Sequence, residues 1–284
     1  MAFKGQPGKA PEAYWDVIRR IIIESDLVLE VLDARLVELS RNEEVERLIK
    51  EVGRPMIFVV NKCDLVSKES LKKQVKELRK SGDVVFVSTK KKGGSKVLLY
   101  QIKKVFKKYG KRYVPPKNKF TPKAEYREAR ANIVVGILGY PNVGKSSIIN
   151  ALAHKKKVKV SKRSGTTHGV HWINVTQDIK LLDSPGVIPL VKEDEIRYGL
   201  IGARDTEALK NPELVAHAVI KLFLKKNKKA LEEFYKIDIE NEDVEDIVGQ
   251  LALKKGFLLK GGKADKHRLV MIIVRDWQQG RLRL

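Results

Sequence analysis

The sequence predicts an α/β fold with a mostly parallel sheet, followed by a small segment made only of helices. Apolar runs of strand length at 26–32, 55–60 and 83–87 alternate with amphipathic helical patterns. A further apolar run, 132–138, leads through a glycine-bearing turn into a helical pattern at 147–152. Alternating strands and helices are typical of a parallel sheet covered by helices. We expect one domain over residues 1–190 and a helical domain over 191–284.

Composition favours a protein with a polyanionic partner. The 284 residues carry 58 Lys and Arg against 35 Asp and Glu, a formal net charge of +23. Such an excess favours nucleic acid. The alternative is the charged surface of a thermophilic protein, which would gain Glu about as fast as Lys.

Other features of the composition suit a cytoplasmic protein. Cys63 is the single cysteine, so no internal disulfide is possible and we expect no disulfide partner. Neither a run of transmembrane length nor a signal peptide is evident, so we expect no membrane contact. We expect a monomer in the cytoplasm.

Residues 139–146 (GYPNVGKS) fit the phosphate-binding pattern G-x-x-x-x-G-K-[ST] between a strand and a helix. The glycines let backbone N–H groups approach phosphate oxygens, and the helix N-terminus adds its positive dipole end. Lys145 would reach the β- and γ-phosphates, and the Ser146 hydroxyl would ligate Mg²⁺. We therefore expect nucleoside triphosphate binding, with contacts from Asn142, Val143, Gly144, Lys145, Ser146 and Ser147.

Residues 61–64 (NKCD) indicate that the base is guanine. They follow the buried run 55–60, where nucleotide-binding α/β folds place ligand contacts. The Asp64 carboxylate can accept hydrogen bonds from N1–H and the exocyclic amine of guanine, which adenine does not offer. Asn61 and Lys62 would brace the loop and pack over the base.

A second base-contacting loop is expected at Ser88, Thr89 and Lys90. It follows the third apolar run and is similar to the S-A-K loop of GTPases, whose backbone contacts guanine O6. Thr89 stands where that loop usually has alanine.

Two further segments are expected to sense the γ-phosphate. Thr167 (in preference to Thr166) lies in the loop after the phosphate-loop helix, where a threonine typically completes Mg²⁺ coordination. Residues 183–186 (DSPG) fit D-x-x-G after a predicted hairpin over 170–182. Asp183 would hold Mg²⁺ through water, and the Gly186 N–H would contact the γ-phosphate.

These five GTPase motifs stand in the order four, five, one, two, three, and the chain resembles the circularly permuted GTPases of the YlqF/RbgA family with their archaeal and nucleolar relatives. Residues 33–35 (DAR) and Trp172 add to the resemblance. It implies a P-loop GTPase domain that uses GTP, GDP and Mg²⁺. It also implies rRNA and the large ribosomal subunit as partners.

Permutation places the D-x-x-G segment directly before the C-terminal residues 187–284. Movement at Gly186 would therefore pass to the helical segment, which we expect to be the output of a switch. Residues 254–284 carry nine Lys or Arg against two acidic residues, which favours docking on RNA phosphates. We expect Trp277 in the core of this segment rather than stacked on a base.

The expected hydrolysis is slow. Val187 stands where many GTPases have a glutamine that orients the attacking water. Lys145, Thr167 and Gly186 are the expected catalytic contacts, and the Asn142 carbonyl is a candidate K⁺ ligand beside the phosphates, since asparagine here occurs in cation-activated GTPases. His168 and His171 are candidates too, although exposed histidines of this kind are more often structural.

Two other functions remain open from the sequence. One is an RNA-binding module in which GTP is structural and rarely hydrolysed. The other is an ATP-dependent small-molecule kinase, which residues 61–64 disfavour.

Overall fold

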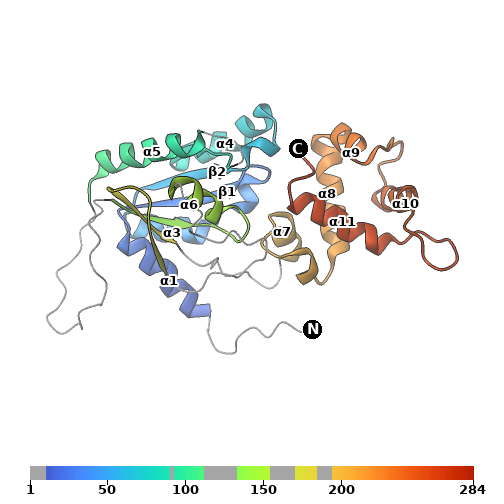
Figure 1. The fold of residues 1–284 in the computed structure, drawn as a ribbon, viewed down its shortest axis with the longest axis horizontal. Coiled ribbons are helices and arrows are strands. Elements are labelled where there is room, and N and C mark those ends of the chain that lie inside the picture. The colour runs from blue at the N-terminus through green and yellow to red at the C-terminus, as the bar shows by residue number, and fades with distance from the viewer. Residues whose placement is uncertain (1–10, 90–92, 112–132, 154–169, 184–193) are drawn as a thin grey trace.

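A six-stranded sheet forms the centre of the amino-terminal half of the chain (Figure 1). The computed structural model describes residues 11–89, 93–111, 133–153, 170–183 and 194–284. The strands are β1 (Leu27–Asp33), β2 (Met56–Asn61), β3 (Asp83–Phe86), β4 (Ile133–Leu138), β5 (His171–Asn174) and β6 (Ile179–Asp183). Their order is β3-β2-β1-β4-β6-β5.

All pairs in this sheet are parallel except β5 with β6. The chain moves outward from β1 through β2 to β3, then returns to β4 on the other side of β1. This reversal between β1 and β4 is the position where open α/β sheets bind ligands. The mostly parallel sheet predicted from the sequence is confirmed.

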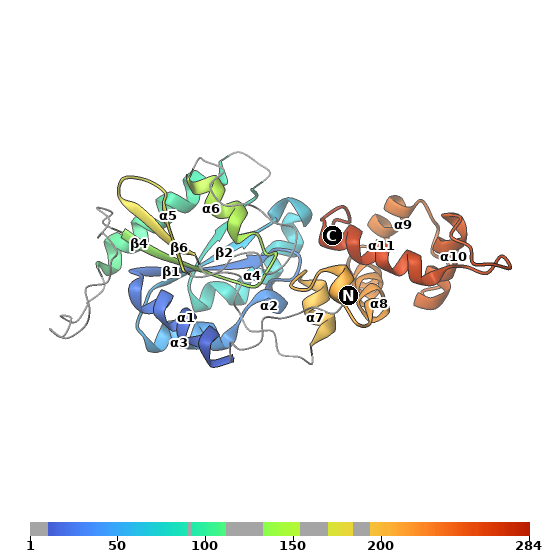
Figure 2. The same ribbon diagram turned by 60° about the horizontal axis from the view of Figure 1, so that its bottom comes forward.

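Helices cover both faces of the sheet. Figure 2 shows α1 (Pro11–Glu24), α2 (Val37–Ser40), α3 (Glu43–Glu51) and α4 (Lys68–Ser81) on one face, with α5 (Gly94–Tyr109) and α6 (Lys145–Ala153) on the other. Side-chain caps set two of the starts, because Asn42 Oδ1 accepts from the Val45 N–H at 3.0 Å and Ser67 Oγ from the Ser70 N–H at 3.2 Å.

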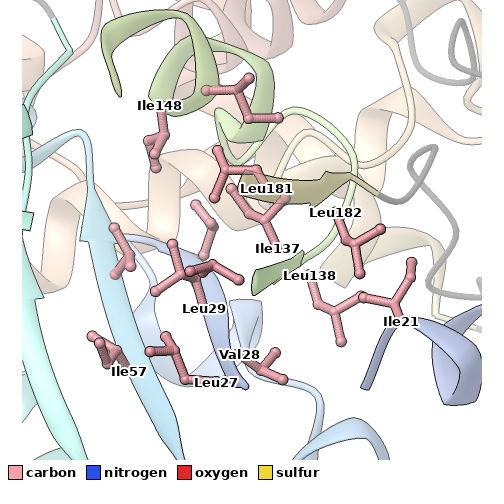
Figure 3. Packing of buried hydrophobic residues seen from close by; sticks show 14 of the residues in the cluster. Ile21, Leu27, Val28, Leu29, Ile57, Ile137, Leu138, Ile148, Leu181 and Leu182 are labelled. Atoms are coloured by element: carbon pink, nitrogen blue, oxygen red, sulfur yellow. The ribbon is translucent and has the colours of Figure 1, made fainter. Parts of the chain in front are cut away.

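The main core lies where β1, β4 and β6 meet α1 and α6. Every residue of β1 and β4 is buried, as expected for parallel strands covered on both faces. Figure 3 shows Leu29, Ile137 and Leu181 from neighbouring strands packed together beneath Ile148 of α6. This rigid centre fixes the strand ends that carry the motifs.

The C-terminal helices pack around a second core. They are α7 (Glu195–Leu200), α8 (Pro212–Lys226), α9 (Lys228–Tyr235), α10 (Val244–Lys254) and α11 (Lys266–Gln278). Trp277 is fully buried, meets Phe223 edge-to-face at 5.9 Å between ring centroids, and donates from Nε1 to the Leu200 carbonyl at 2.6 Å. The predicted core position of Trp277 is confirmed. None of the described helices is long and apolar enough to cross a membrane.

Replacing Gly136 with alanine is expected to destabilise the sheet by about 1–3 kcal/mol, since β4 leaves no room for a side chain. A Cβ there would lie 2.6 Å from Ser25 Oγ, which is itself held by a 2.6 Å hydrogen bond to the Ile21 carbonyl. Urea unfolding measures the effect. The control is Gly249→Ala in α10, where the nearest atom is the flexible Lys266 side chain at 3.7 Å and helix propensity favours alanine by up to about 1 kcal/mol. Equal midpoints for G136A and the unaltered protein would contradict this packing.

Candidate nucleotide-binding site

The motifs predicted from the sequence lie at one edge of the sheet. Asn61 ends β2, Ser88 follows β3, residues 139–144 follow β4 and Asp183 ends β6. These strands are parallel, so their carboxyl ends share that edge.

A direct hydrogen bond joins the guanine motif to the phosphate loop. Asn61 Nδ2 donates to the Val143 carbonyl at 2.9 Å, although the two residues are 82 positions apart in sequence. Gly144 permits this approach, because a Cβ at that position would lie 2.2 Å from Asn61 Nδ2 and the backbone has φ +104°. The two motifs therefore build one site.

The guanine end of the site brings two loops together. Cys63–Leu65 form a single 3₁₀ turn after Lys62, whose backbone is left-handed at φ 63°. The Ser88 hydroxyl donates to Asp64 Oδ1 at 2.6 Å, which holds the carboxylate in place. Thr89 is exposed. Lys90 lies outside the described residues.

Lys62 is held by the buried carboxylate of Asp33, a residue to which the sequence motifs gave no role in the site. Asp33 accepts from Lys62 Nζ at 2.8 Å and from Arg35 Nη2 at 2.7 Å. Burial raises the pKa of Asp33, but the charges of Arg35 and Lys62 outweigh it and hold that pKa well below its ordinary value. The carboxylate thus stays ionised and braces the base of the guanine loop.

Arg35 carries this network into the helical segment. Its guanidinium lies 4.2 Å from the Trp277 ring centroid and donates from Nη1 to the Trp277 carbonyl. Asp33 and Arg35 belong to the DAR sequence noted above. The DAR sequence marked both residues, but it could not predict their partners, because these are Lys62 in the guanine motif and Trp277 on α11.

The phosphate end holds a buried lysine and a buried acid. Lys145 Nζ donates to the carbonyls of Gly139 and Tyr140, at 2.5 and 2.8 Å. Burial lowers the pKa of Lys145 to about 8, against the opposing charge of Asp183. Burial likewise raises the pKa of Asp183 to about 6, partly offset by Lys145 and His171. The negative charge of a phosphate beside Lys145 would raise the pKa of this lysine again and so favour its charged form.

The arrangement fits a Mg²⁺–nucleotide. Asp183 Oδ1 and Asn61 Oδ1 are buried and have no hydrogen-bond partner among the described residues. Such atoms cost about 1–3 kcal/mol each unless a ligand or water satisfies them. The described part of the chain has no cluster of three or more His, Cys, Asp or Glu side chains for a metal. Mg²⁺ usually binds through one or two carboxylates plus substrate phosphates, so Asp183 and Ser146 suit it.

Asn142 connects the phosphate loop to the helical segment. Its backbone is left-handed, with φ 59°. Its Nδ2 donates to the Gly202 carbonyl at 2.7 Å and to Asp205 Oδ1 at 3.2 Å. The K⁺ contact expected from the sequence would use the carbonyl oxygen of the same amide.

Several predicted residues cannot be placed. Thr167, Gly186 and Val187 lie outside the described residues, as does His168. The boundary expected near residue 190 lies outside them too. His171 is exposed on β5.

Comparisons with known proteins find relatives that are named as GTPases or GTP-binding proteins. Residues 134–254 match the family model described as 50S ribosome-binding GTPase. The chain is 36% identical over 266 residues to an uncharacterized GTP-binding protein of Methanocaldococcus jannaschii, covering 94% of this chain and 65% of that one. It is 30% identical over 272 residues to nucleolar GTP-binding protein 2 of Pneumocystis carinii, covering 94% and 52%. The chain thus spans about half to two thirds of these relatives.

The fold is that of YlqF. The structure of GNP-bound YlqF from T. maritima matches with a TM-score of 0.58 at 21% sequence identity, over 97% of this chain and 96% of that one. The GDP-bound structure of YlqF matches with a TM-score of 0.60 at 21% identity, over 94% of this chain and 95% of that one. The chain therefore has the fold of a circularly permuted P-loop GTPase, and the two relatives above are named as GTP-binding proteins. The family match begins inside β4, and the Asn61 motif precedes it in the chain. The motif order inferred from the sequence is confirmed.

Cys63 offers a test of whether the loop after β2 is closed. Burial raises the pKa of its thiol to about 11, and Sγ lies 3.0 Å from the Val60 carbonyl. At about pH 8 its alkylation should be roughly a hundredfold slower than that of a free thiol of pKa about 8.5, and the rate should rise with pH to beyond about pH 10. Iodoacetamide labelling followed by mass spectrometry measures this at the chain's single cysteine, with glutathione as control. An inflection near the ordinary thiol pKa would mean that the loop is open.

Proposed function

We propose that the protein hydrolyses GTP as a switch that binds rRNA during assembly of the large ribosomal subunit. The hydrogen bond from Asn61 to the phosphate loop carries the nucleotide part of this proposal, since it joins a guanine-reading loop to a phosphate-binding loop. The printed family description, 50S ribosome-binding GTPase, and the nucleolar names of relatives support the ribosomal part.

Each part of the site has a role in binding GTP. The Asp64 carboxylate accepts from the guanine base, with Ser88 fixing its orientation. Backbone N–H groups of 143–147 meet the phosphates, and Lys145 exchanges the Gly139 and Tyr140 carbonyls for phosphate oxygens. Ser146, Thr167 and Asp183 are the proposed holders of Mg²⁺, which supplies positive charge to the phosphates when bound.

Hydrolysis in this proposal is slow without a stimulating partner. Gly186 contacts the γ-phosphate, while Val187 cannot orient the attacking water. Asn142 is the proposed K⁺ ligand, which would place a positive charge where an arginine finger acts in other GTPases. Faster hydrolysis in KCl than in NaCl is the observation that supports this role, and equal rates would remove it.

The helical segment is the proposed output. It contacts the site at both ends, for example through Asn142 on Gly202 and through Arg35 on Trp277. Contacts at opposite ends of the nucleotide site give the helices a way to respond to its occupancy. We propose that residues 191–284 form this domain and that its basic end, 254–284, docks on RNA phosphates.

The alternative is an RNA-binding protein with a structural, rarely hydrolysed GTP. The buried Asp33 network favours it in one respect, because a strongly braced guanine loop suits a permanently held nucleotide. Cytoplasmic location and a monomeric state remain predictions, and the nucleolar names of relatives make nucleolar location an alternative.

Sedimentation with large ribosomal subunits tests the proposal. The protein should bind at least about fivefold more tightly with a non-hydrolysable GTP analogue than with GDP, a coupling of about 1 kcal/mol. Lys145→Ala should remove this nucleotide response while leaving nucleotide-free binding unchanged, because Lys145 is buried away from the surface.

Equal binding in the two nucleotide states would favour the structural-GTP alternative. Absence of binding in every state would reject the ribosomal partner.

A further inference from the structure

The positive charge of the chain lies mainly outside the C-terminal helices. Residues 194–284 carry 18 Lys or Arg against 15 Asp or Glu, whereas residues 1–193 carry 40 against 20. The basic end at 254–284 is balanced by acidic residues earlier in the same segment. A polyanionic partner therefore has more positive charge to bind in residues 1–193.

Helix α5 is the described element with the clearest surplus. Its residues 94–109 contain five lysines and no acidic residue. Three large side chains are also exposed there, Tyr100 at 69%, Val97 at 56% and Tyr109 at 56%. Leu98, Ile102 and Val105 are buried on the opposite side, so packing on the sheet fixes which face is presented.

Tyr100 stands at the centre of the exposed face. Lys96, Lys103 and Lys104 are four residues before it and three and four after it, positions that neighbour it on a helix surface. Lys107 is one further turn along. From Lys96 to Lys107 this face extends about 17 Å at the rise of an α-helix. An exposed aromatic ring bordered by cations is the arrangement that binds unpaired bases and their phosphates.

Helix α4 shows what an ordinary solvated lysine-rich face looks like in the same protein. It carries six Lys or Arg together with Glu69 and Glu77, and Lys80 pairs with Glu77 at 2.7 Å. Its sequence contains no aromatic residue. On α5, by contrast, the ion pair found among the described residues is Lys103 with Asp178, at 3.8 Å with both side chains 55% exposed. α4 thus has a basic surplus without an exposed aromatic ring, whereas α5 combines its surplus with the exposed Tyr100 ring.

We propose that the face of α5 formed by Lys96, Tyr100, Lys104 and Lys107 binds single-stranded RNA. Tyr100 stacks on a base and the lysines contact the flanking phosphates. The proposal rests on the RNA-binding function above and adds a surface to it. α5 lies apart from the C-terminal helices in both views, so the two RNA contacts would be separate (Figures 1 and 2).

The position of α5 also connects RNA with the nucleotide. The helix begins six residues after Ser88, the partner of Asp64, and a Cβ on Gly94 would lie 3.1 Å from Val87 Cγ1. RNA on this face would therefore lie next to the guanine-reading loops.

Fluorescence anisotropy with a labelled single-stranded RNA of about 16 nucleotides tests the surface. Tyr100→Ala should weaken binding about fivefold or more, and Tyr100→Phe, which keeps the ring, should stay within about twofold. The triple variant K96Q/K104Q/K107Q should lower the slope of log Kd against log salt concentration by about 2. The matched control, K72Q/K73Q/K76Q, removes the same charge from exposed positions of α4 and should leave the slope nearly unchanged. Thermal melts of all variants check the fold.

The outcomes separate the two proposals. RNA binding by the unaltered protein, with equal losses in the α4 and α5 triple variants or no loss in Tyr100→Ala, would overturn the α5 surface alone. Failure of the unaltered protein to bind any RNA, with ribosomal subunits also left unbound, would overturn the proposed function together with it.

Discussion

The hydrogen bond from Asn61 to the Val143 carbonyl is the contact on which the nucleotide site depends. It joins the end of β2 to the phosphate loop after β4, across β1. Its partners are buried, so losing the donor would leave a carbonyl without a partner, at a cost of about 1–3 kcal/mol. It also explains Gly144, because a larger residue would push the two motifs apart.

This contact makes the permuted order physically reasonable. A sheet edge is assembled from strand ends, and the edge is the same whichever strand comes first in the chain. What permutation changes is the covalent connection. The segment after Asp183 leads directly to the C-terminal helices, and α11 returns to Arg35 beside the guanine loop. The helices are therefore tied to the site by the chain and by packing.

Asp33 links the guanine motif to the C-terminal helices. Its carboxylate is shared by Lys62 of the guanine motif and by Arg35, which contacts Trp277. Removing one partner of such a buried ion pair typically lowers the free energy of unfolding by about 3–5 kcal/mol, because the remaining charge is buried and no longer compensated. The network therefore couples the stability of the helical packing to the geometry of the guanine loop.

Local patterns predicted most of the fold, and they located the two motifs that the structure brings together at one edge of the sheet. The strands were evident because buried parallel strands are continuous apolar runs, and the motifs because phosphate and guanine each demand particular residues at fixed spacing. The four-residue helix α2 was missed, being too short for a helical period. The Arg35–Trp277 contact spans 242 residues and the Asn142–Gly202 contact spans 60, and neither leaves a periodic signal. Lys62 was expected over the base, whereas its ammonium contacts Asp33.

The most direct test of a shared guanine site is the base preference of Asp64→Asn. An amide at this position loses the acceptor for the guanine amine and can instead donate to the carbonyl that xanthine carries there. Titration should show GDP affinity falling about a hundredfold in D64N, with xanthosine diphosphate becoming the preferred ligand. Unchanged GDP binding by D64N would contradict the account, since Asp64 would then not lie against the base.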